Sequence, residues 1–270
     1  MNQVREASPI VHNITNYVTV NDCANILLAC GASPIMADDI LEVEEITSIC
    51  NSLVINLGTL NERTIKSMIV AGKKANELGH PVILDPVGAG ASRLRTETAL
   101  RLLEEIKFSV IRGNASEINT LFSGTSTTKG VDVDAADIIT EDKRTEAVNR
   151  AKLLSERTSS VIIITGELDI VADATKAYVI RNGHPMMSRI TGTGCMLSAV
   201  LGAFCAAGSK DILSAAAEGV CAMGSCGEMA YEKVINNKEG TASFKVHMID
   251  CMSRMDTNEL SKLAKIEEIC

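Results

Sequence analysis

Short apolar runs and amphipathic segments alternate along most of this chain. Runs rich in Val, Ile and Leu that end at Gly, Pro or Asp are typical of strands buried on both faces, and apolar residues three or four positions apart predict helices. The pattern predicts strands at 52–58, 80–86, 108–114 and 160–167. It predicts helices at 62–79, 96–106, 115–124 and 142–158. We therefore expect an α/β fold with a mostly parallel central sheet and helices on both faces.

Both ends of the chain depart from this alternation. A hairpin is predicted at 169–173 and 176–181, followed by three long helices at 192–207, 211–236 and 247–268. Near the start, the polar stretch "VHNITNY" precedes an apolar helix, and "GASPIMA" is a strand-like piece. The Gly-, Ser- and Thr-rich patch at 123–130 is expected to be a surface loop. Because no stretch has linker, low-complexity or repeat character, we expect a single domain over residues 1–270.

Composition limits the classes of function. A net charge of −8 disfavours a nucleic-acid partner, and an aromatic content of 3% leaves little for base stacking. The longest apolar stretch, near 195–207, is too short to span a bilayer, and the first residues lack the apolar core of a signal peptide. None of the nine cysteines has the C-x-x-C spacing of a zinc site. We expect a cytoplasmic protein with no membrane or nucleic-acid partner, whose cysteines are mostly reduced and buried.

The residues that follow the predicted strands are the first candidates for a functional site. Ligands of open α/β sheets bind beyond the carboxyl ends of the strands. Polar side chains and glycines occupy these positions, namely Asn56, Gly58, Asp85, Arg112, Asn114, Thr165 and Glu167. We expect them to gather at one edge of the sheet.

The stretch "ITGTGCMLSAVLGA" places Gly192, Thr193, Gly194 and Cys195 at the start of a helix of small apolar residues. Glycines let the backbone approach a ligand closely, and the free amides and dipole of a helix N-terminus attract an anion. The stretch therefore predicts a cradle for a phosphoryl group. It equally fits a Gly-rich turn that lets the helix pack closely. It lacks the Lys of a Walker A loop and the G-x-G-x-x-G spacing of a dinucleotide site.

Three further side chains have a functional and a structural interpretation. A helix N-terminus lowers the pKa of a thiol, so Cys195 is a candidate to orient a substrate hydroxyl and take its proton, although a cysteine is more often inert packing. Asp85 and Glu117 suit Mg²⁺, which prefers few protein ligands. They also suit a turn acid before Pro86 and a first-turn acid that complements a helix dipole. For His12 and Tyr17 we favour ordinary helix-cap and packing roles.

Five segments in order match a known family: "VHNITNYVTVNDCANILLACGASPIMA", "LDPVGAGAS", "IRGNASEI", "IITGELD" and "TGTGCMLSA". The chain resembles the hydroxyethylthiazole kinases, thiamine-salvage enzymes with a ribokinase-like fold, and the likeness extends through 239–250. The resemblance implies that ATP phosphorylates the hydroxyl of 4-methyl-5-(2-hydroxyethyl)thiazole in the presence of Mg²⁺. It also implies a homotrimer with the thiazole pocket between subunits.

The resemblance further implies a role for each matching residue. Cys195 would lie beside the acceptor hydroxyl, and Gly192 with Thr193 and Gly194 would form the anion cradle. The remaining residues would contact the thiazole (Asn16 and Met36), the nucleotide phosphates (Arg112 and Thr165) and the metal (Asp85 and Glu117). Asn16 and Met36 would face Cys195 of a neighbouring chain. We expect the cradle to contribute most of the catalysis and Cys195 to contribute modestly.

Three alternatives remain open at this point. A related small-alcohol kinase, of the hydroxymethylpyrimidine or pyridoxal type, would share the fold but not the "HNITN…GASPIMA" stretch. A non-catalytic nucleotide-binding protein would bind ATP without turnover. A Rossmann dehydrogenase would need the fingerprint that is missing here.

Overall fold

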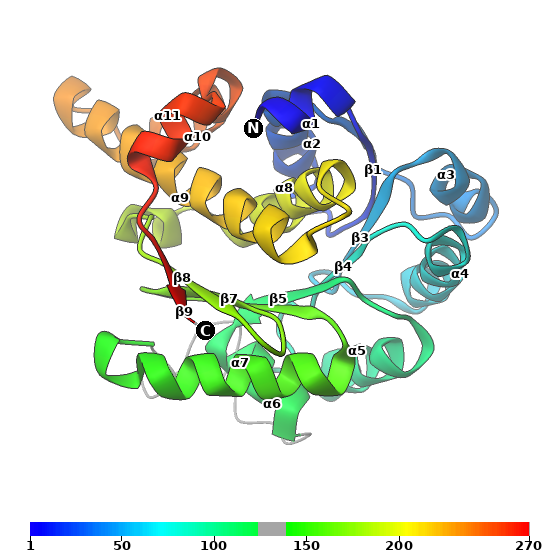
Figure 1. Ribbon diagram of the computed structural model, residues 1–270. Helices are drawn as coiled ribbons and strands as arrows, with labels where there is room; N and C mark the ends of the chain where they lie inside the picture. Colours follow the sequence, from blue (N-terminus) through cyan, green and yellow to red (C-terminus); the bar gives the residue numbers. More distant parts are fainter. Residues whose placement is uncertain (124–138, 270) are drawn as a thin grey trace.

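A nine-stranded sheet forms the centre of the computed structural model, which describes residues 1–123 and 139–269 (Figure 1). The strand order is β2-β1-β3-β4-β5-β6-β7-β8-β9. The strands are β1 Ile10–Ile14, β2 Ser33–Ile35, β3 Ser52–Asn56, β4 Val82–Asp85, β5 Val110–Asn114, β6 Val161–Thr165, β7 Asp169–Ala172, β8 Ala177–Ile180 and β9 Ile266–Ile269.

The sheet has a parallel part and an antiparallel part. Strands β2 to β6 in this order pair in parallel, so the carboxyl ends of β1, β3, β4, β5 and β6 share one edge of the sheet. The pairs β6–β7, β7–β8 and β8–β9 are antiparallel, and the predicted hairpin is β7–β8. The prediction of a mostly parallel α/β sheet is therefore confirmed.

Helices cover both faces of the sheet, as Figure 1 shows. One core lies between the sheet and α1, α2, α8, α9, α10 and α11, and the other lies between the sheet and α3 to α7. The helices are α1 Asn2–Ala7, α2 Val20–Cys30, α3 Val43–Ile49, α4 Glu62–Leu78, α5 Arg93–Glu105, α6 Ala115–Ser123, α7 Arg144–Thr158, α8 Thr193–Ala207, α9 Ile212–Asn237, α10 Thr241–Arg254 and α11 Thr257–Leu263, with short 3₁₀ turns η2 Glu141–Lys143 and η3 Pro185–Arg189. The interior strands β3, β4 and β6 are nearly all apolar on both sides because both faces of the sheet are covered.

Helix α8 is the most buried of the helices beside the site. Its residues from Met196 to Cys205 are all buried, and Gly202 fits against Val11 and Val54 of the sheet so closely that a methyl group there would lie 2.8 Å from both. The small residues that make α8 apolar on all sides thus allow it to lie directly on β1 and β3. This packing fixes the position of the N-terminus of α8 at the carboxyl edge of the sheet.

The C-terminal part of the chain differs from the prediction. The prediction of a continuous helix at 247–268 is wrong, because α10 ends at Arg254. A new helix, α11, follows, capped by Asp256, which accepts a hydrogen bond from the Glu259 amide, and β9 comes after it. The amphipathic spacing continues across the break, which hid it. Strand β1 and helices α1 and α3 were not predicted, since each is short. The loop expected at 123–130 falls, beyond residue 123, outside the described residues.

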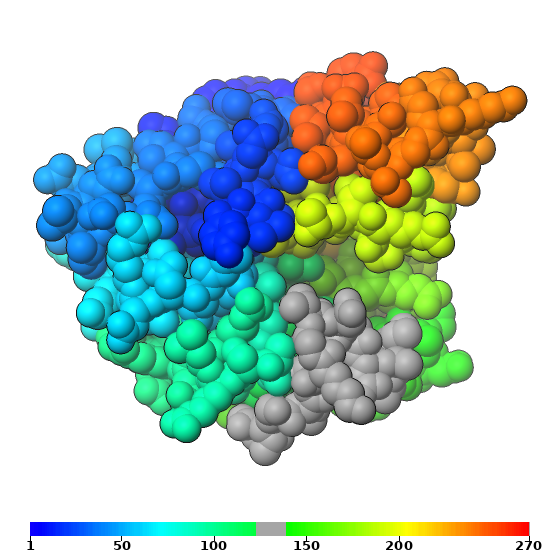
Figure 2. All heavy atoms as spheres, turned by 180° about the vertical axis from the view of Figure 1, so that it is seen from behind, coloured from blue at the N-terminus to red at the C-terminus, as the bar shows by residue number. Residues whose placement is uncertain are grey.

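The N-terminal and C-terminal helices meet on one face of the sheet. Helix α2 contacts α10, and the N-terminal elements lie beside the C-terminal helices in both views (Figures 1 and 2). The turn between α9 and α10 projects from the body in both views. Among the described helices, none combines the length and apolar character needed to cross a bilayer.

Candidate active site

Five strand ends and one helix N-terminus converge at the carboxyl edge of the sheet. Asn56 and Asp85 are the last residues of β3 and β4, Arg112 lies near the end of β5, and Thr165 ends β6. Asn16 follows β1, and Cys195 lies in the first turn of α8. Because the strands are parallel and in register, residues far apart in sequence come within hydrogen-bond distance here.

Asp85 is the buried centre of this cluster. Its side chain is fully buried, and Oδ2 accepts hydrogen bonds from Asn56 Nδ2 and Ser198 Oγ, each at 2.8 Å. Arg112 Nη1 lies 3.4 Å from Oδ1. Burial raises the pKa of Asp85, whereas the Arg112 charge and the hydrogen bonds from Ser198 and Asn56 lower it. The carboxylate is therefore held in place by three donors that favour its charged form.

Arg112 joins Asp85 to Thr165 across the site. Its Nη2 donates to Thr165 Oγ1 at 2.8 Å, and Thr165 Oγ1 donates to the carbonyl oxygen of Gly113 at 3.3 Å. The guanidinium lies against the first turn of α8, where a Cβ on Gly194 would meet Arg112 Nη1 at 2.5 Å. The buried Nε of Arg112 has no hydrogen-bond partner within the described part of the chain. The two residues predicted to contact nucleotide phosphates therefore contact one another.

The N-terminus of α8 depends on its glycines. Gly192 is the N-cap with φ of 93°, in the left-handed region, and a Cβ there would lie 2.8 Å from Thr19 Cγ2. Thr193 Oγ1 donates to the carbonyl oxygen of Met187 and fixes the approach from η3. No side chain caps the first turn of α8, so its amides face the site. This geometry leaves the first-turn amides of α8 available to an anion, while the contacts of the two glycines also fit a turn that lets the helix pack closely.

Cys195 is the third residue of α8 and is partly exposed, whereas the other seven cysteines of the described chain are buried. Two carboxamides approach its sulfur: Asn16 Nδ2 at 3.3 Å and Asn56 Nδ2 at 3.4 Å. Burial raises the pKa of the Cys195 thiol, and the Asp85 charge raises it further, against hydrogen bonds from Thr19 and Asn16 and the Arg112 charge. The expectation of a lowered pKa is wrong, because burial and the nearby Asp85 carboxylate raise it.

Asn16 lies within the same network rather than across a subunit boundary. Its Nδ2 contacts both Asn56 Oδ1, at 3.0 Å, and Cys195 of the same chain. The expectation that Asn16 faces Cys195 of a neighbouring chain is therefore wrong. Met36 follows β2 at the edge of the sheet, partly buried against the core that includes α8, and no contact places it in the cluster.

Glu117 lies in the first turn of α6, close to Asp85. Its Oε1 accepts from the Gly88 amide at 2.8 Å and its Oε2 from the Asn114 amide at 2.9 Å. Asn114 Oδ1 in turn accepts from the Glu117 amide at 2.8 Å, as in a capping box. Burial and the Asp85 charge raise the pKa of Glu117, whereas Arg112 and the two amides lower it. Glu117 thus holds the loop after β4 and also caps α6.

The two acids fit a magnesium ion in its usual protein setting. No group of three or more His, Cys, Asp or Glu side chains in the described residues is arranged to hold a metal. Mg²⁺ needs no such group, because it commonly takes one or two carboxylates together with water and substrate phosphates. Asp85 and Glu117 are buried, mutually repelling carboxylates whose pKa values are raised, which a cation beside them would relieve.

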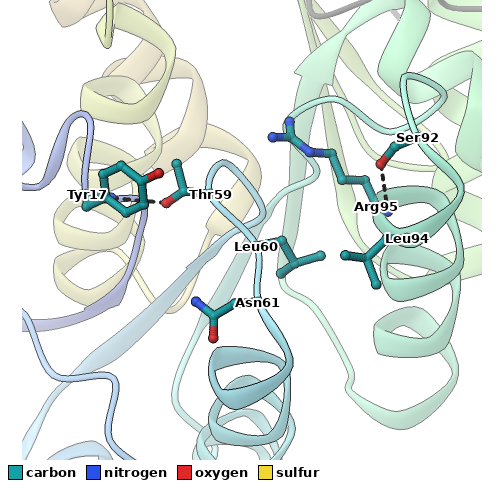
Figure 3. A pocket seen from close by; sticks show the side chains of 7 residues that line it. All are labelled: Tyr17, Thr59, Leu60, Asn61, Ser92, Leu94 and Arg95. Carbon is teal, nitrogen blue, oxygen red and sulfur yellow. Dashed lines mark hydrogen bonds between the residues drawn. The ribbon is translucent and has the colours of Figure 1, made fainter.

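A pocket of about 370 Å³ opens between the start of α5 and the loops after β1 and β3 (Figure 3). Its lining comes from the loops after β1 and β3 and the start of α5, namely Tyr17, Thr59, Leu60, Asn61, Ser92, Leu94 and Arg95. Arg95 donates to the carbonyl oxygens of Gly58 and Val87 and so joins the loops after β3 and β4. Tyr17 is 78% exposed, so its predicted packing role is wrong. His12 is fully buried and contacts Thr47 and Ala37, which confirms its structural role.

Sequence reasoning did not assign a role to three residues of the site. Ser198 faces Asp85 from within α8, Thr19 lies against Gly192, and Asn56 links Asp85 to Cys195. Asn56 stood out as a polar residue at a strand end. Ser198 gave no signal, because a serine in an apolar helix is common and only the fold shows which strand it faces.

Comparison with known proteins decides the family. The model of the hydroxyethylthiazole kinase family matches residues 1–258. The chain belongs to this family. It is 58% identical to the hydroxyethylthiazole kinase of Clostridium acetobutylicum over 267 residues, which cover 99% of this chain and 97% of that protein. The resemblance carried by the five sequence segments is thus confirmed.

Solved structures agree with the family and with the fold. The hydroxyethylthiazole kinase of Pyrococcus horikoshii OT3 is 37% identical and superposes with a TM-score of 0.88, covering 100% of this chain and 97% of that one. A ribokinase-like superfamily protein from Enterococcus faecalis V583 has a TM-score of 0.56 at 11% identity, covering 91% of this chain and 86% of that one. The latter likeness shows the fold alone, and the fold of this hydroxyethylthiazole kinase family member is ribokinase-like.

Proposed function

We propose that the protein transfers the γ-phosphoryl group of ATP to the hydroxyl of 4-methyl-5-(2-hydroxyethyl)thiazole, which yields the thiazole phosphate and ADP. The observation that supports it most is the convergence of the uncapped α8 N-terminus, Arg112 and Asp85 beside the partly exposed Cys195. The α8 N-terminus and Arg112 suit the negatively charged phosphoryl group, and Asp85 suits the cation that assists its transfer. Cys195 lies where a small alcohol would bind.

The residues divide the work of phosphoryl transfer. The hydroxyl oxygen attacks the γ-phosphorus, the bond from that phosphorus to the ADP oxygen breaks, and the hydroxyl proton is released to solvent water. The first-turn amides of α8 and the Arg112 guanidinium bind the transferring group, with Thr165 holding Arg112. Gly192 and Gly194 keep this region free of side-chain bulk, and the Thr193 hydroxyl is directed to the carbonyl oxygen of Met187. Most of the rate enhancement then comes from positioning and charge stabilisation.

Cys195 orients the hydroxyl rather than acting as a strong base. Its pKa lies above the ordinary thiol value, so at neutral pH the sulfur carries a proton. We assign Asp85 and Glu117 to the metal side of the site, where Mg²⁺ would neutralise charge on the phosphate oxygens. Asn16 acts beside Cys195 and Met36 provides an apolar contact for the thiazole.

The assembly and location of the enzyme complete the proposal. We assign a homotrimer with the thiazole pocket between subunits, supported by large side chains that a single chain leaves exposed: Tyr17 and Leu94 of the pocket lining, and Val18 next to Tyr17 in the chain. Free cysteines among the described residues suit a reducing compartment, which supports a cytoplasmic location. Light scattering in solution tests the trimer, because a monomeric mass would contradict it.

A coupled assay of ADP release tests the reaction. The protein is incubated with ATP and one of three alcohols (the thiazole alcohol, hydroxymethylpyrimidine or pyridoxal), each with and without Mg²⁺. We expect turnover with the thiazole alcohol that requires Mg²⁺ and is much weaker with the other two. Preference for either other alcohol would identify a related kinase. ATP binding without ADP release from any alcohol would identify a non-catalytic nucleotide-binding protein.

A further inference from the structure

Asn56 hydrogen-bonds both the buried carboxylate of Asp85 and the thiol of Cys195. It is the last residue of β3, 2% exposed, and its carboxamide lies between Asp85 and Cys195. On the other side it contacts Asn16, which follows β1. Two strands and the N-terminus of α8 are thereby joined through one side chain.

All four hydrogen-bonding positions of the Asn56 carboxamide are used. Its two N–H bonds point to Asp85 Oδ2 at 2.8 Å and to Cys195 Sγ at 3.4 Å, and Oδ1 accepts from Asn16 Nδ2 at 3.0 Å and the Gly58 amide at 2.9 Å. A flipped carboxamide would set its oxygen against Asp85 and its NH₂ group against the Gly58 N–H. The carboxylate of Asp85 therefore fixes which atom of Asn56 faces the sulfur.

Hydrogen bonds hold the Asn16 carboxamide in one orientation as well. Its Oδ1 accepts from the amide and the hydroxyl of Thr19, at 3.2 and 3.1 Å. Its NH₂ group is then directed to Asn56 Oδ1 and Cys195 Sγ. The sulfur thus accepts two amide N–H bonds from fixed directions, so its own S–H bond is left to point away from both carboxamides.

We propose that Asn56 and Asn16 form an amide clamp that positions the Cys195 thiol for the acceptor hydroxyl. In this role Asn56 is a positioning residue, because it acts on the substrate only through Cys195. The inference rests on the proposed function, since it assumes that Cys195 lies beside the hydroxyl. This role is separate from phosphate binding, because the side chain of Asn56 forms no hydrogen bond with Arg112 or with the described glycines of the cradle.

The chain offers a matched control for Asn56. Ser198 Oγ donates to the same atom, Asp85 Oδ2, at the same 2.8 Å as Asn56 Nδ2, and Ser198 is fully buried. Replacing either residue by Ala removes one donor from Asp85. Only the replacement of Asn56 also removes a donor from Cys195. Because Asn56→Ala also removes the acceptor for Asn16 Nδ2 and the Gly58 amide, the effect on the thiol is isolated by comparing each variant with and without Cys195.

The experiment is a double-mutant cycle measured as kcat for the thiazole alcohol at saturating ATP. Asn56→Ala and Ser198→Ala are each made in the native background and in a Cys195→Ala background. We expect Asn56→Ala to lower kcat about tenfold more in the native background than in the Cys195→Ala background, about the effect of one lost hydrogen bond. Ser198→Ala is expected to lower kcat by the same factor in both. The KM for ATP should change little with Asn56→Ala.

The outcomes separate the clamp from its alternatives. Equal losses for Asn56→Ala in both backgrounds would overturn the clamp, as would a loss that lies entirely in the KM for ATP. If Asn56→Ala does not fold, by thermal unfolding, Asn16→Ala takes its place and must show the same dependence on Cys195. A native enzyme that releases no ADP with the thiazole alcohol would overturn the proposed function and the clamp with it, whereas an active native enzyme with additive losses would overturn the clamp alone.

Discussion

Replacing Gly194 by Ala tests the contact between α8 and Arg112. The new Cβ would lie 2.5 Å from Arg112 Nη1, 2.8 Å from Nη2 and 3.0 Å from Cζ. Ordinary contact begins near 3.4 Å, so the guanidinium must retreat by about 1 Å. Arg112 cannot do this and keep its 2.8 Å bond to Thr165 and its 3.4 Å contact with Asp85. The substitution thus displaces the charge without removing it.

The expected loss follows from these contacts. Hydrogen bonds of a charged group contribute about 1.5–3 kcal/mol, so displacement of the guanidinium should lower kcat/KM for ATP roughly 10- to 100-fold. Stability should fall modestly as well, because the displaced guanidinium weakens its bonds to Thr165 and to the buried Asp85, and the preference of a helix for Ala over Gly, about 1 kcal/mol, offsets only part of that loss. Kinetics are therefore measured at a temperature well below the unfolding midpoint of both proteins.

The assay is coupled ADP release at saturating thiazole alcohol with ATP varied, together with thermal unfolding. Gly240→Ala is the control, since a Cβ there meets nothing within 4 Å and its φ is −115°. In an Arg112→Ala background, Gly194→Ala should have almost no further effect. Native kinetics in Gly194→Ala, or an equal loss with and without Arg112, would refute the reasoning.

Three further perturbations have defined outcomes. Asp85→Asn is expected to raise the Mg²⁺ concentration for half-maximal turnover roughly 10- to 100-fold, because it removes a carboxylate charge from the metal side; an unchanged Mg²⁺ titration would show that Asp85 has another role. Gly192→Ala should lower the midpoint of thermal unfolding by roughly 3–8 °C, since its φ is 93° and its Cβ would lie 2.8 Å from Thr19; calorimetry showing no change would mean that the turn relaxes freely. Burial raises the pKa of the partly exposed Asp169 from 3.8 to about 7, although the Gly166 amide and the Arg112 charge lower it. Between these two pH values the folded state binds more protons than the unfolded state, so the free energy of unfolding falls as the pH rises. Asp169→Asn should remove that contribution, which is at most about 4 kcal/mol and smaller in practice because Asp169 is partly exposed. The free energy of unfolding in urea is measured from about pH 4.5 to about pH 8, and an equally steep fall in both proteins would contradict the prediction.

The sheet and most of its helices follow from local pattern. Strands β3, β4 and β6 are nearly continuous apolar runs, and α4, for example, begins directly after its capping residue Asn61 and ends directly before Gly79, as the spacing indicates. Short elements were missed because a strand such as β1, which contains His12 and Asn13, has no apolar run. The break between α10 and α11 was missed because Asp256 fits an amphipathic helix until its capping bond is seen.

The site was predictable to the extent that strand ends predict position. Asp85, Arg112 and Thr165 are in contact because parallel strands bring their ends together. The pKa of Cys195 was not predictable, since its direction depends on burial and on the distance to Asp85 rather than on the helix N-terminus alone. The contact of Asn16 with Cys195 of its own chain depends on how the loop after β1 folds back, which no local pattern encodes.

A crystal structure with a non-hydrolysable ATP analogue, Mg²⁺ and the thiazole alcohol tests the central claim most directly. The account predicts the terminal phosphate at the first-turn amides of α8 beside Arg112, with the alcohol oxygen next to Cys195 Sγ. A terminal phosphate bound away from the N-terminus of α8, or an alcohol bound away from Cys195, would contradict it.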